Sequence, residues 1–172
     1  MLIIDEINRG NLSRVFGELM YLLEYRDKTI PLAGEEAPFG IPANVHIIGT
    51  MNTADRSIAV VDHALRRRFS FFHLAPDYEV LRSHLEKDGL VADGLLKALQ
   101  AVNAAIDDRN YEVGISFFLK DGAALGSALK DIWEGEIEPY LEEYFYDQPG
   151  KLEPLRWKSL AASMLASWNA TE

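Results

Sequence analysis

The chain opens with the stretch LIIDEINRGN at residues 2–11, an apolar run that ends in two adjacent carboxylates. Residues 1–4 are all apolar, which predicts a short strand buried on both faces of a parallel sheet. Asp5 and Glu6 follow at once, and alternate strand residues point to opposite faces, so both acids cannot enter one apolar layer. At the carboxyl end of a parallel strand they would overhang the crevice where α/β sheets bind ligands.

Two interpretations of this acidic pair are open. An Asp at that position can hold Mg²⁺ through water, and the following Glu can polarise an attacking water molecule. Alternatively, Asp5 and Glu6 face solvent and stabilise the N-terminus of the next helix. The pair alone does not decide between a site and a solvated strand end.

The rest of the first half alternates helices with strands. A helix is expected from Asn11, which can cap it, to about Tyr25. The stretch KTIPLAGEEAPFGIPA (28–43) contains three prolines and two glycines, which exclude a helix interior and predict a loop or small hairpin. Further along, the patterns predict a buried strand at 45–51 (VHIIGTM), a helix at 58–68 (IAVVDHALRRR) and a third strand at 69–74 (FSFFHL).

The composition changes after Pro76, and helical patterns follow one another. They cover residues 78–87, 90–107, 123–133, 137–145 and 154–168. The stretch NYEVGISFF (110–118) is expected to be extended or turn-like. The sequence therefore predicts an α/β part at 1–76 followed by an all-α part at 77–172.

A second polar cluster, GTMNTADRS (49–57), lies where the strand at 45–51 ends. Asn52 directly after an apolar strand is well placed to orient a water molecule or a phosphate, and Asp55 and Arg56 add a charge pair. The alternative is an ordinary turn, because Asn, Asp and Thr side chains fold back onto their own backbone.

A third cluster, ALRRRF (64–69), carries three consecutive arginines. Consecutive helix residues point about 100° apart, so Arg66, Arg67 and Arg68 cannot all serve one site. At least one should pack or pair locally, while the others could reach an anion, including one held by a neighbouring subunit. Basic residues at the end of a helix also complement its dipole without any further function.

Composition excludes several classes of protein. The 172 residues include no cysteine, which rules out disulfides, zinc–thiolate sites and a thiol nucleophile. The net charge of −10 disfavours a surface that grips DNA phosphates. No apolar run reaches the length of a membrane span, the N-terminus is not a signal peptide, and neither a histidine metal site nor a hydrolase triad is supported. A soluble, cytoplasmic globular protein is expected.

In combination, the three clusters resemble an AAA+ NTPase downstream of its P-loop. LIIDEINRGNLSRVFGELMYLLE (2–24) resembles a Walker B segment, and IIGTMNTADRSIAVVDHALRRRFSF (47–71) resembles a sensor-1 and arginine-finger segment. The turn MNTADR (51–56) is similar to the signature of the McrB family, the NTP-driven subunits of McrBC-type methyl-directed restriction systems. IEPYLEEYFYDQPGKL (137–152) is similar to the helical lid of that family.

The resemblance implies catalytic roles at the strand ends. Asp5 would lie in the Mg²⁺ shell through water, Glu6 would polarise the attacking water, and Asn52 would be the sensor-1 residue that places this water against the γ-phosphate. The implied cofactor is Mg²⁺ with GTP or ATP.

The resemblance also implies an interface between subunits of a homo-oligomeric ring. Arg67 and Arg68 match positions that reach the neighbour's nucleotide, whereas Arg66 would pack locally. The remaining residues assigned to the link between site and interface are Asp55, Arg56, Asn8 and Arg9. The implied partners are an McrC-like nuclease subunit and DNA, which would be contacted through other domains or subunits, with no membrane.

Two departures from the family pattern limit the resemblance. Where family members often read IGHSYF, this chain reads VGISFF (113–118), with Ile115 in place of the histidine, so no lid residue is assigned to the nucleotide. The 172 residues contain no G-x-x-x-x-G-K-[ST] loop to cradle phosphates. The expectation is therefore a C-terminal fragment that begins at Walker B: a truncated AAA+ core plus a helical lid, inactive alone.

Without the P-loop strand, the strand at 69–74 would lack a neighbour, and exposed strand edges invite pairing with another chain. Either this segment rearranges or oligomerisation covers it. Two other functions remain open: a MoxR-like ATPase that remodels proteins, and a truncated, non-catalytic module that joins such rings.

Overall fold

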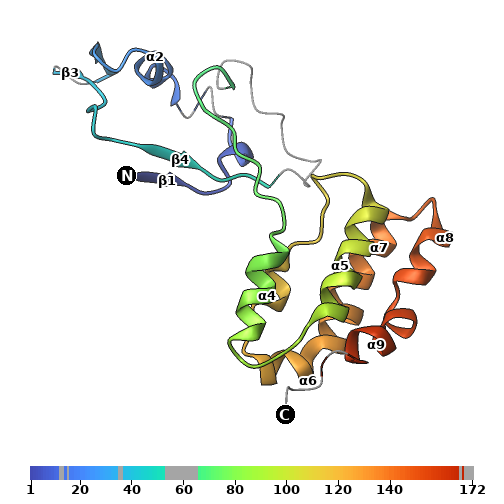
Figure 1. Cartoon of the computed structure of the whole chain (residues 1–172). Coiled ribbons are helices and arrows are strands. Elements are labelled where there is room, and N and C mark those ends of the chain that lie inside the picture. Colours follow the sequence, from blue (N-terminus) through green and yellow to red (C-terminus); the bar gives the residue numbers. More distant parts are fainter. Residues whose placement is uncertain (12–13, 15, 35–36, 53–65, 167, 169–172) are drawn as a thin grey trace. The chain divides into compact units, whose positions relative to one another are not determined.

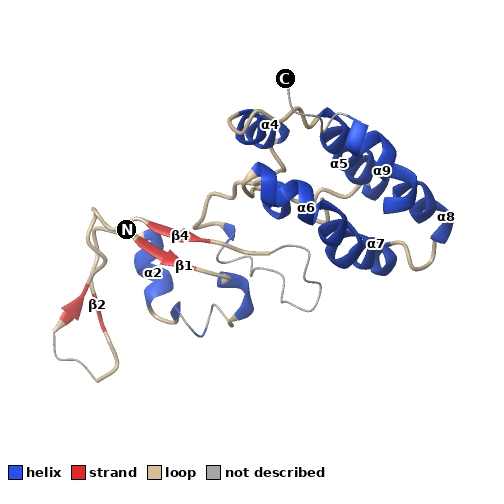
Figure 2. Cartoon of the chain, turned by 90° about the horizontal axis from the view of Figure 1, so that it is seen from below, coloured by secondary structure: helices blue, strands red, loops and turns tan. Residues whose placement is uncertain are grey.

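The computed structural model of the chain describes residues 1–11, 14, 16–34, 37–52, 66–166 and 168 (Figure 1). The chain divides into two compact units, Met1–His73 and Leu74–Glu172. The first, here called the α/β unit, holds short strands and helices, whereas the described residues of the second, the helical unit, form helices and no strand (Figure 2).

Two parallel strands form the sheet that carries the first sequence motif. Strand β1 (Leu2–Ile4) pairs with β4 (Ile47–Gly49), and Leu2 lies opposite Ile47. Both strands are where the sequence predicts them, but the expected burial on both faces is wrong, since Ile3 is 58% exposed. A parallel sheet is normally covered on both faces, and the described residues of this unit supply only two strands of it.

The last part of the helix expected from Asn11 to Tyr25 is observed as α2 (Leu19–Glu24). A 3₁₀ turn, η1 (Ile7–Arg9), precedes the expected start, and residues 12, 13 and 15 lie outside the described residues. Gly17 has a φ of 44°, a left-handed conformation that interrupts helical geometry just before α2. Phe16 packs against Ile4, Ile7 and α2 residues to form a small apolar cluster.

The proline-rich connection forms the small hairpin that its sequence predicts. Strand β2 (Ile30–Pro31) pairs in antiparallel fashion with β3 (Pro38–Phe39). Arg26, which precedes the hairpin, donates a hydrogen bond of 2.5 Å from its guanidinium to the carbonyl of Val45. This bond ties the end of α2 to the segment that enters β4.

The predicted third strand at residues 69–74 is wrong. These residues have no regular secondary structure, and Phe72 and Leu74 are 86% and 92% exposed. A strand needs a neighbour to pair with its backbone N–H and C=O groups, and in the described part of the chain β4 pairs only with β1. The segment is therefore rearranged from the expected strand, and its coverage by a second chain stays a prediction.

The helical unit contains the helices that the second half of the sequence predicts. In chain order they are α4 (Tyr78–Glu86), α5 (Asp93–Ile106), α6 (Gly122–Ile132), α7 (Glu138–Tyr144), α8 (Pro149–Leu152) and α9 (Trp157–Ala166). Asp77 caps α4, because its carboxylate accepts hydrogen bonds from the amides of Glu79 and Val80. None of the described helices is long and apolar enough to cross a membrane.

One continuous apolar core holds these helices together. Leu95, Leu99 and Val102 on α5 recur at helical spacing and are fully buried, and they pack with buried residues of α4, α6, α7 and α9. Trp133 is also fully buried, and its indole N–H donates to the carbonyl of Leu155 at 3.0 Å.

The boundaries between these helices differ from the sequence prediction in two places. A π turn, η3 (Trp133–Ile137), joins α6 directly to α7 where two separate helices were expected. The 3₁₀ turn η2 (Ile115–Phe118) agrees with the extended or turn-like segment expected at residues 110–118. The last helix begins at Trp157, because Pro154 lies in the 3₁₀ turn η4 (Glu153–Leu155) and Arg156 is extended. Helix α8 was not predicted.

Candidate functional site

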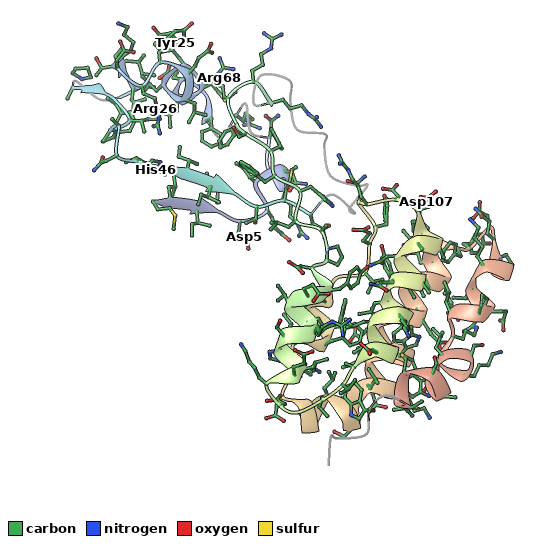
Figure 3. All side chains as sticks on the ribbon, in the orientation of Figure 1. Asp5, Tyr25, Arg26, His46, Arg68 and Asp107 are labelled. Atoms are coloured by element: carbon green, nitrogen blue, oxygen red, sulfur yellow. The ribbon has the colours of Figure 1, made fainter. Side chains whose placement is uncertain are left out.

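The ends of β1 and β4 bring the first two sequence clusters together. Ile4 lies opposite Gly49 in the parallel register, so Asp5 and Thr50 leave the sheet at the same edge. Asp5 lies at the end of β1, away from His46 at the start of β4 (Figure 3). The carboxyl edge of a parallel sheet is the usual place for ligand binding in α/β proteins. We call Asp5, Glu6, Asn8, Arg9, Thr50 and Asn52 the strand-end site.

Thr50 makes several hydrogen bonds within this site. It was not selected as a site residue from the sequence. Its hydroxyl donates to Asp5 Oδ1 and accepts from the amide of Glu6 at 3.1 Å. Its own amide donates to the carbonyl of Ile4 at 3.0 Å, and its carbonyl accepts from the amide of Ile7 at 2.8 Å. A signal was available: a hydroxyl residue stands where the second strand ends, opposite the acids of the first.

Glu6 follows the strand in a left-handed conformation, with φ 49° and ψ 46°. This conformation turns the backbone into η1 and carries Arg9 back towards the acid. The Arg9 Nε atom lies 2.6 Å from Glu6 Oε2, and both side chains are substantially exposed. The carboxylate expected to polarise water is therefore held by a cation from the next turn of its own chain.

Asn8 connects the acidic turn to the segment after β4. It is only 8% exposed, and its Nδ2 donates to the carbonyl of Asn52 at 3.3 Å. Its Oδ1 is buried and has no hydrogen-bond partner among the described residues. Asn8 and Asn52, both selected from the sequence, are thus brought together.

A glycine favours the close approach of η1 to β4. A Cβ added at Gly49 would lie 2.9 Å from Cδ1 of Ile7, closer than real Cβ atoms come to a side-chain carbon. Gly49 therefore lets the turn that carries Glu6 and Asn8 lie against the neighbouring strand.

The three arginines differ from one another in their surroundings. The Arg66 guanidinium lies 5.8 Å from the ring centroid of Phe71, and Arg68 forms an ion pair of 2.7 Å with Glu24 at the end of α2. Arg67 is exposed. The local packing expected of Arg66 is observed, and Arg68 is also held within its own chain.

Part of the sequence-derived site lies outside the described residues. This applies to Asp55, Arg56 and residues 58–65 of the expected helix. Their predicted roles are therefore not addressed by the geometry.

The donor set at the strand ends fits Mg²⁺ better than a metal held by protein ligands alone. Among the described residues, no group of three or more His, Cys, Asp or Glu side chains is arranged to hold a metal ion. Mg²⁺ usually takes only one or two carboxylates and completes its shell with water and substrate phosphates. Asp5, whose Oδ1 accepts a hydrogen bond from the Thr50 hydroxyl, supplies one such carboxylate at the strand ends.

The helical unit contains an open pocket of about 710 Å³. Its lining includes Tyr78, Asn103, Asp107, Arg109 and Glu112. Ile115 lies in η2 and is not part of this lining.

The class of protein is identified by a match in the part of the chain that holds the sheet. Residues 1–69 match the AAA domain of the dynein-related subfamily. This is the part of the chain that holds β1, β4 and the strand-end site.

The helical unit identifies the family within that class. Residues 94–153 match the McrB alpha-helical lid domain. The chain is 40% identical over 183 aligned positions to the Type IV methyl-directed restriction enzyme EcoKMcrB subunit of Escherichia coli (strain K12), an alignment that covers 94% of this chain and 40% of that protein. The chain belongs to the McrB family of AAA+ proteins.

A second relative is also a component of a restriction enzyme. The chain is 36% identical over 95 residues to the Type II restriction enzyme BsuMI component YdiS of Bacillus subtilis (strain 168), covering 43% of this chain and 26% of that protein. The chain thus spans less than half the length of either relative.

Proposed function

We propose that this chain supplies the Walker B and sensor-1 side of an NTP-hydrolysing site in a McrB-like motor protein. Residues 1–76 would form part of the AAA+ core and residues 77–172 its lid. The reaction would be hydrolysis of GTP or ATP with Mg²⁺ at the interfaces of a homo-oligomeric ring.

One observation carries this proposal: the register of β1 and β4 brings Asp5, Glu6 and Asn52 to one edge of the sheet. Two acids at the end of a single strand could equally well be solvated charges without a catalytic role. Two acids after one strand and the Asn52 backbone after the other are joined by hydrogen bonds through Thr50 and Asn8, and this arrangement supports a site for phosphoryl transfer to water.

Each residue of the strand-end site then has a defined task. Bound Mg²⁺ supplies positive charge against the phosphate oxygens, and Asp5 would hold it through water. Glu6 would accept a proton from the attacking water at its carboxylate, and Asn52 would orient that water. Glu6 has to exchange its contact with Arg9 for a contact with water, and both side chains are exposed enough to do so.

The ring interface would use the arginine cluster. Arg67 is the first candidate for the neighbour's nucleotide, because it is exposed, whereas Arg68 would first have to leave Glu24. A finger of this kind contributes about 10³–10⁵ in rate in related phosphoryl-transfer enzymes. Asp55 and Arg56, together with Asn8 and Arg9, would connect the site to this interface.

A role in DNA restriction is favoured over protein remodelling by the two relatives, whose names both describe components of restriction enzymes. The motor would act with an McrC-like nuclease subunit. With a net charge of −10, this chain is not suited to hold DNA itself, so DNA would be bound by other domains or subunits.

The test is nucleotide turnover in a chimera. The matched segment of the Escherichia coli relative is replaced by this chain, and GTP and ATP hydrolysis are measured with and without Mg²⁺. Glu6→Gln keeps the size and shape of the side chain but removes the base, so turnover should fall by at least about 100-fold. Nucleotide affinity should change little.

Glu18→Gln is the matched control, since Glu18 is an exposed glutamate outside the strand-end site. It should turn over nucleotide as fast as the unmodified chimera. Equal rates for Glu6→Gln and Glu18→Gln would contradict the catalytic role of Glu6. An inert chimera that still assembles with its partners would instead support a non-catalytic ring module.

A further inference from the structure

We propose that Thr50 is a positioning residue that holds Asp5 and Glu6 in a fixed mutual orientation. This inference rests on the proposed function, because it concerns how the two acids are presented to nucleotide and water. Thr50 forms hydrogen bonds with four consecutive residues, Ile4, Asp5, Glu6 and Ile7. Thr50 is therefore bonded to both residues of the acidic pair and to the residue on either side of the pair.

The direction of the two side-chain bonds follows from simple proton accounting. A hydroxyl has one proton to donate and can accept through its oxygen, whereas a backbone amide can only donate. The amide of Glu6 donates to Thr50 Oγ1 at 3.1 Å, which leaves the hydroxyl proton for Asp5 Oδ1. Asp5 Oδ1 accepts this bond, so the Thr50 hydroxyl fixes the position of the carboxylate at the end of β1.

The backbone of Glu6 gives this bond a second role. Residues other than glycine rarely adopt the left-handed conformation, with φ 49° and ψ 46°, that Glu6 has here. The bond from the Glu6 amide to Thr50 stabilises the turn, and this turn determines where the Glu6 side chain leaves the backbone. One hydroxyl thereby orients a carboxylate of one acid and the main chain of the other.

A threonine is better suited than a serine to this task. Two heavy substituents on Cβ restrict χ1, so the hydroxyl is held in place at little entropic cost. Thr50→Val keeps this branched shape and removes only the hydroxyl. The two backbone bonds of residue 50 and the bond from Asn8 to Asn52 do not involve the hydroxyl, so the turn should still form in this variant.

The first measurement uses the 172-residue chain and needs no turnover. Residue-resolved amide hydrogen exchange compares the unmodified chain with Thr50→Val and with Thr50→Ser, which retains the hydroxyl. The Glu6 amide should exchange at least about tenfold faster in Thr50→Val and within about threefold of the unmodified rate in Thr50→Ser. The amide of Ile7, which bonds to the Thr50 carbonyl, serves as the internal reference.

The second measurement is GTP and ATP turnover of the same variants in the chimera described above. Loss of a residue that orients a metal-linked carboxylate typically costs about 10–100-fold in activity or metal affinity. We therefore expect kcat to fall in that range for Thr50→Val, with a higher half-saturating Mg²⁺ concentration and KM for nucleotide within about threefold. Thr50→Ser should restore both values to near the unmodified level.

The outcomes separate this inference from the proposed function. If the chimera with Thr50 turns over nucleotide and Thr50→Val matches Thr50→Ser in rate and Mg²⁺ dependence, the positioning role is wrong while the function stands. If every chimera is inert, the proposed function fails, and the Glu6 amide still decides whether Thr50 holds the acidic turn. Unchanged Glu6 exchange in Thr50→Val would overturn the inference in either case.

Discussion

The two units of this chain differ in how much of their own apolar surface they cover. In the helical unit, buried side chains from every long helix form one continuous cluster. In the α/β unit, a small cluster surrounds Phe16, while Leu2, Ile3 and Ile48 on the strands remain exposed. The helical unit therefore derives its stability from packing, whereas the geometry of the strand-end site depends on hydrogen bonds made by Thr50 and Asn8.

The largest difference in stability between the units is expected when one apolar side chain in each is truncated to alanine. Leu99→Ala removes a fully buried side chain from α5 and should lower the free energy of unfolding by about 2–5 kcal/mol. Ile48→Ala removes an apolar side chain that is 47% exposed on β4 and should cost less than about 1 kcal/mol.

The two truncations can be measured separately. All three tryptophans, Trp133, Trp157 and Trp168, belong to the helical unit, so urea unfolding followed by fluorescence reports Leu99→Ala. Residue-resolved hydrogen exchange reports Ile48→Ala. If Ile48→Ala costs as much as Leu99→Ala, the face of the sheet is covered and the contrast between the units does not hold.

A smaller effect is expected from the buried asparagines, one in each unit. Asn103 donates to the Tyr78 hydroxyl at 2.8 Å and to the Val113 carbonyl at 3.1 Å, and it accepts from the Val113 amide at 2.7 Å. Asn103→Ala leaves these groups unpaired and should destabilise the helical unit by about 1–3 kcal/mol, measured by urea unfolding.

Asn8→Ala is the matching substitution in the α/β unit, to be compared with Asn103→Ala. Asn8 makes one longer bond to Asn52, and its buried Oδ1 is already without a partner in the described part of the chain. Its removal should cost less than about 1 kcal/mol in hydrogen-exchange protection of the α/β unit. Equal costs for the two asparagines would mean that Asn8 is more firmly bonded than its described contacts indicate.

The smallest effect is a pH dependence confined to the helical unit. Burial, followed by the neighbouring Tyr144, raises the pKa of Tyr140 to about 12, and its hydroxyl donates to the Tyr111 carbonyl at 2.5 Å. The unfolded chain loses this proton near its ordinary pKa of 10, before the folded chain does. The contribution of Tyr140 to the free energy of unfolding is therefore fully present below pH 10 and declines as the pH rises from 10 towards 12.

Tyrosine absorbance and fluorescence-detected unfolding across this pH range test the assignment. Tyr140→Phe should remove the late phenol titration and reduce the alkaline loss of stability of the helical unit. Tyr146→Phe, at a position 89% exposed, should leave both unchanged. An identical alkaline profile in Tyr140→Phe and the unmodified chain would refute the role of burial at this position.

Periodic and strand-end features were readable from the sequence. The apolar spacing of α5 predicts its type and most of its length, because a helix that packs on a core repeats its contacts every three or four residues. The polar residues at the strand ends were likewise readable: Asp5 directly follows β1, and Asn52 lies three residues after the end of β4.

Features that depend on long-range pairing were not readable. Residues 69–74 have the composition of a strand but form none, because strand formation requires a neighbour that no local pattern reveals. Thr50 was missed for the related reason that its value depends on the register between β1 and β4. Gly17 and η3 shift helix boundaries through backbone geometry, which residue type suggests only weakly.

The π turn η3 has a consequence for how this family can tolerate insertions and deletions. A π turn takes up one more residue than an α turn, so α6 and α7 keep nearly the same relative rotation as in an uninterrupted helix that is one residue shorter. A chain shortened by one residue here could therefore continue as plain α-helix with Leu141 still directed into the core. A Cβ added at Gly135 would meet nothing within 4 Å, so this position also accepts a new side chain.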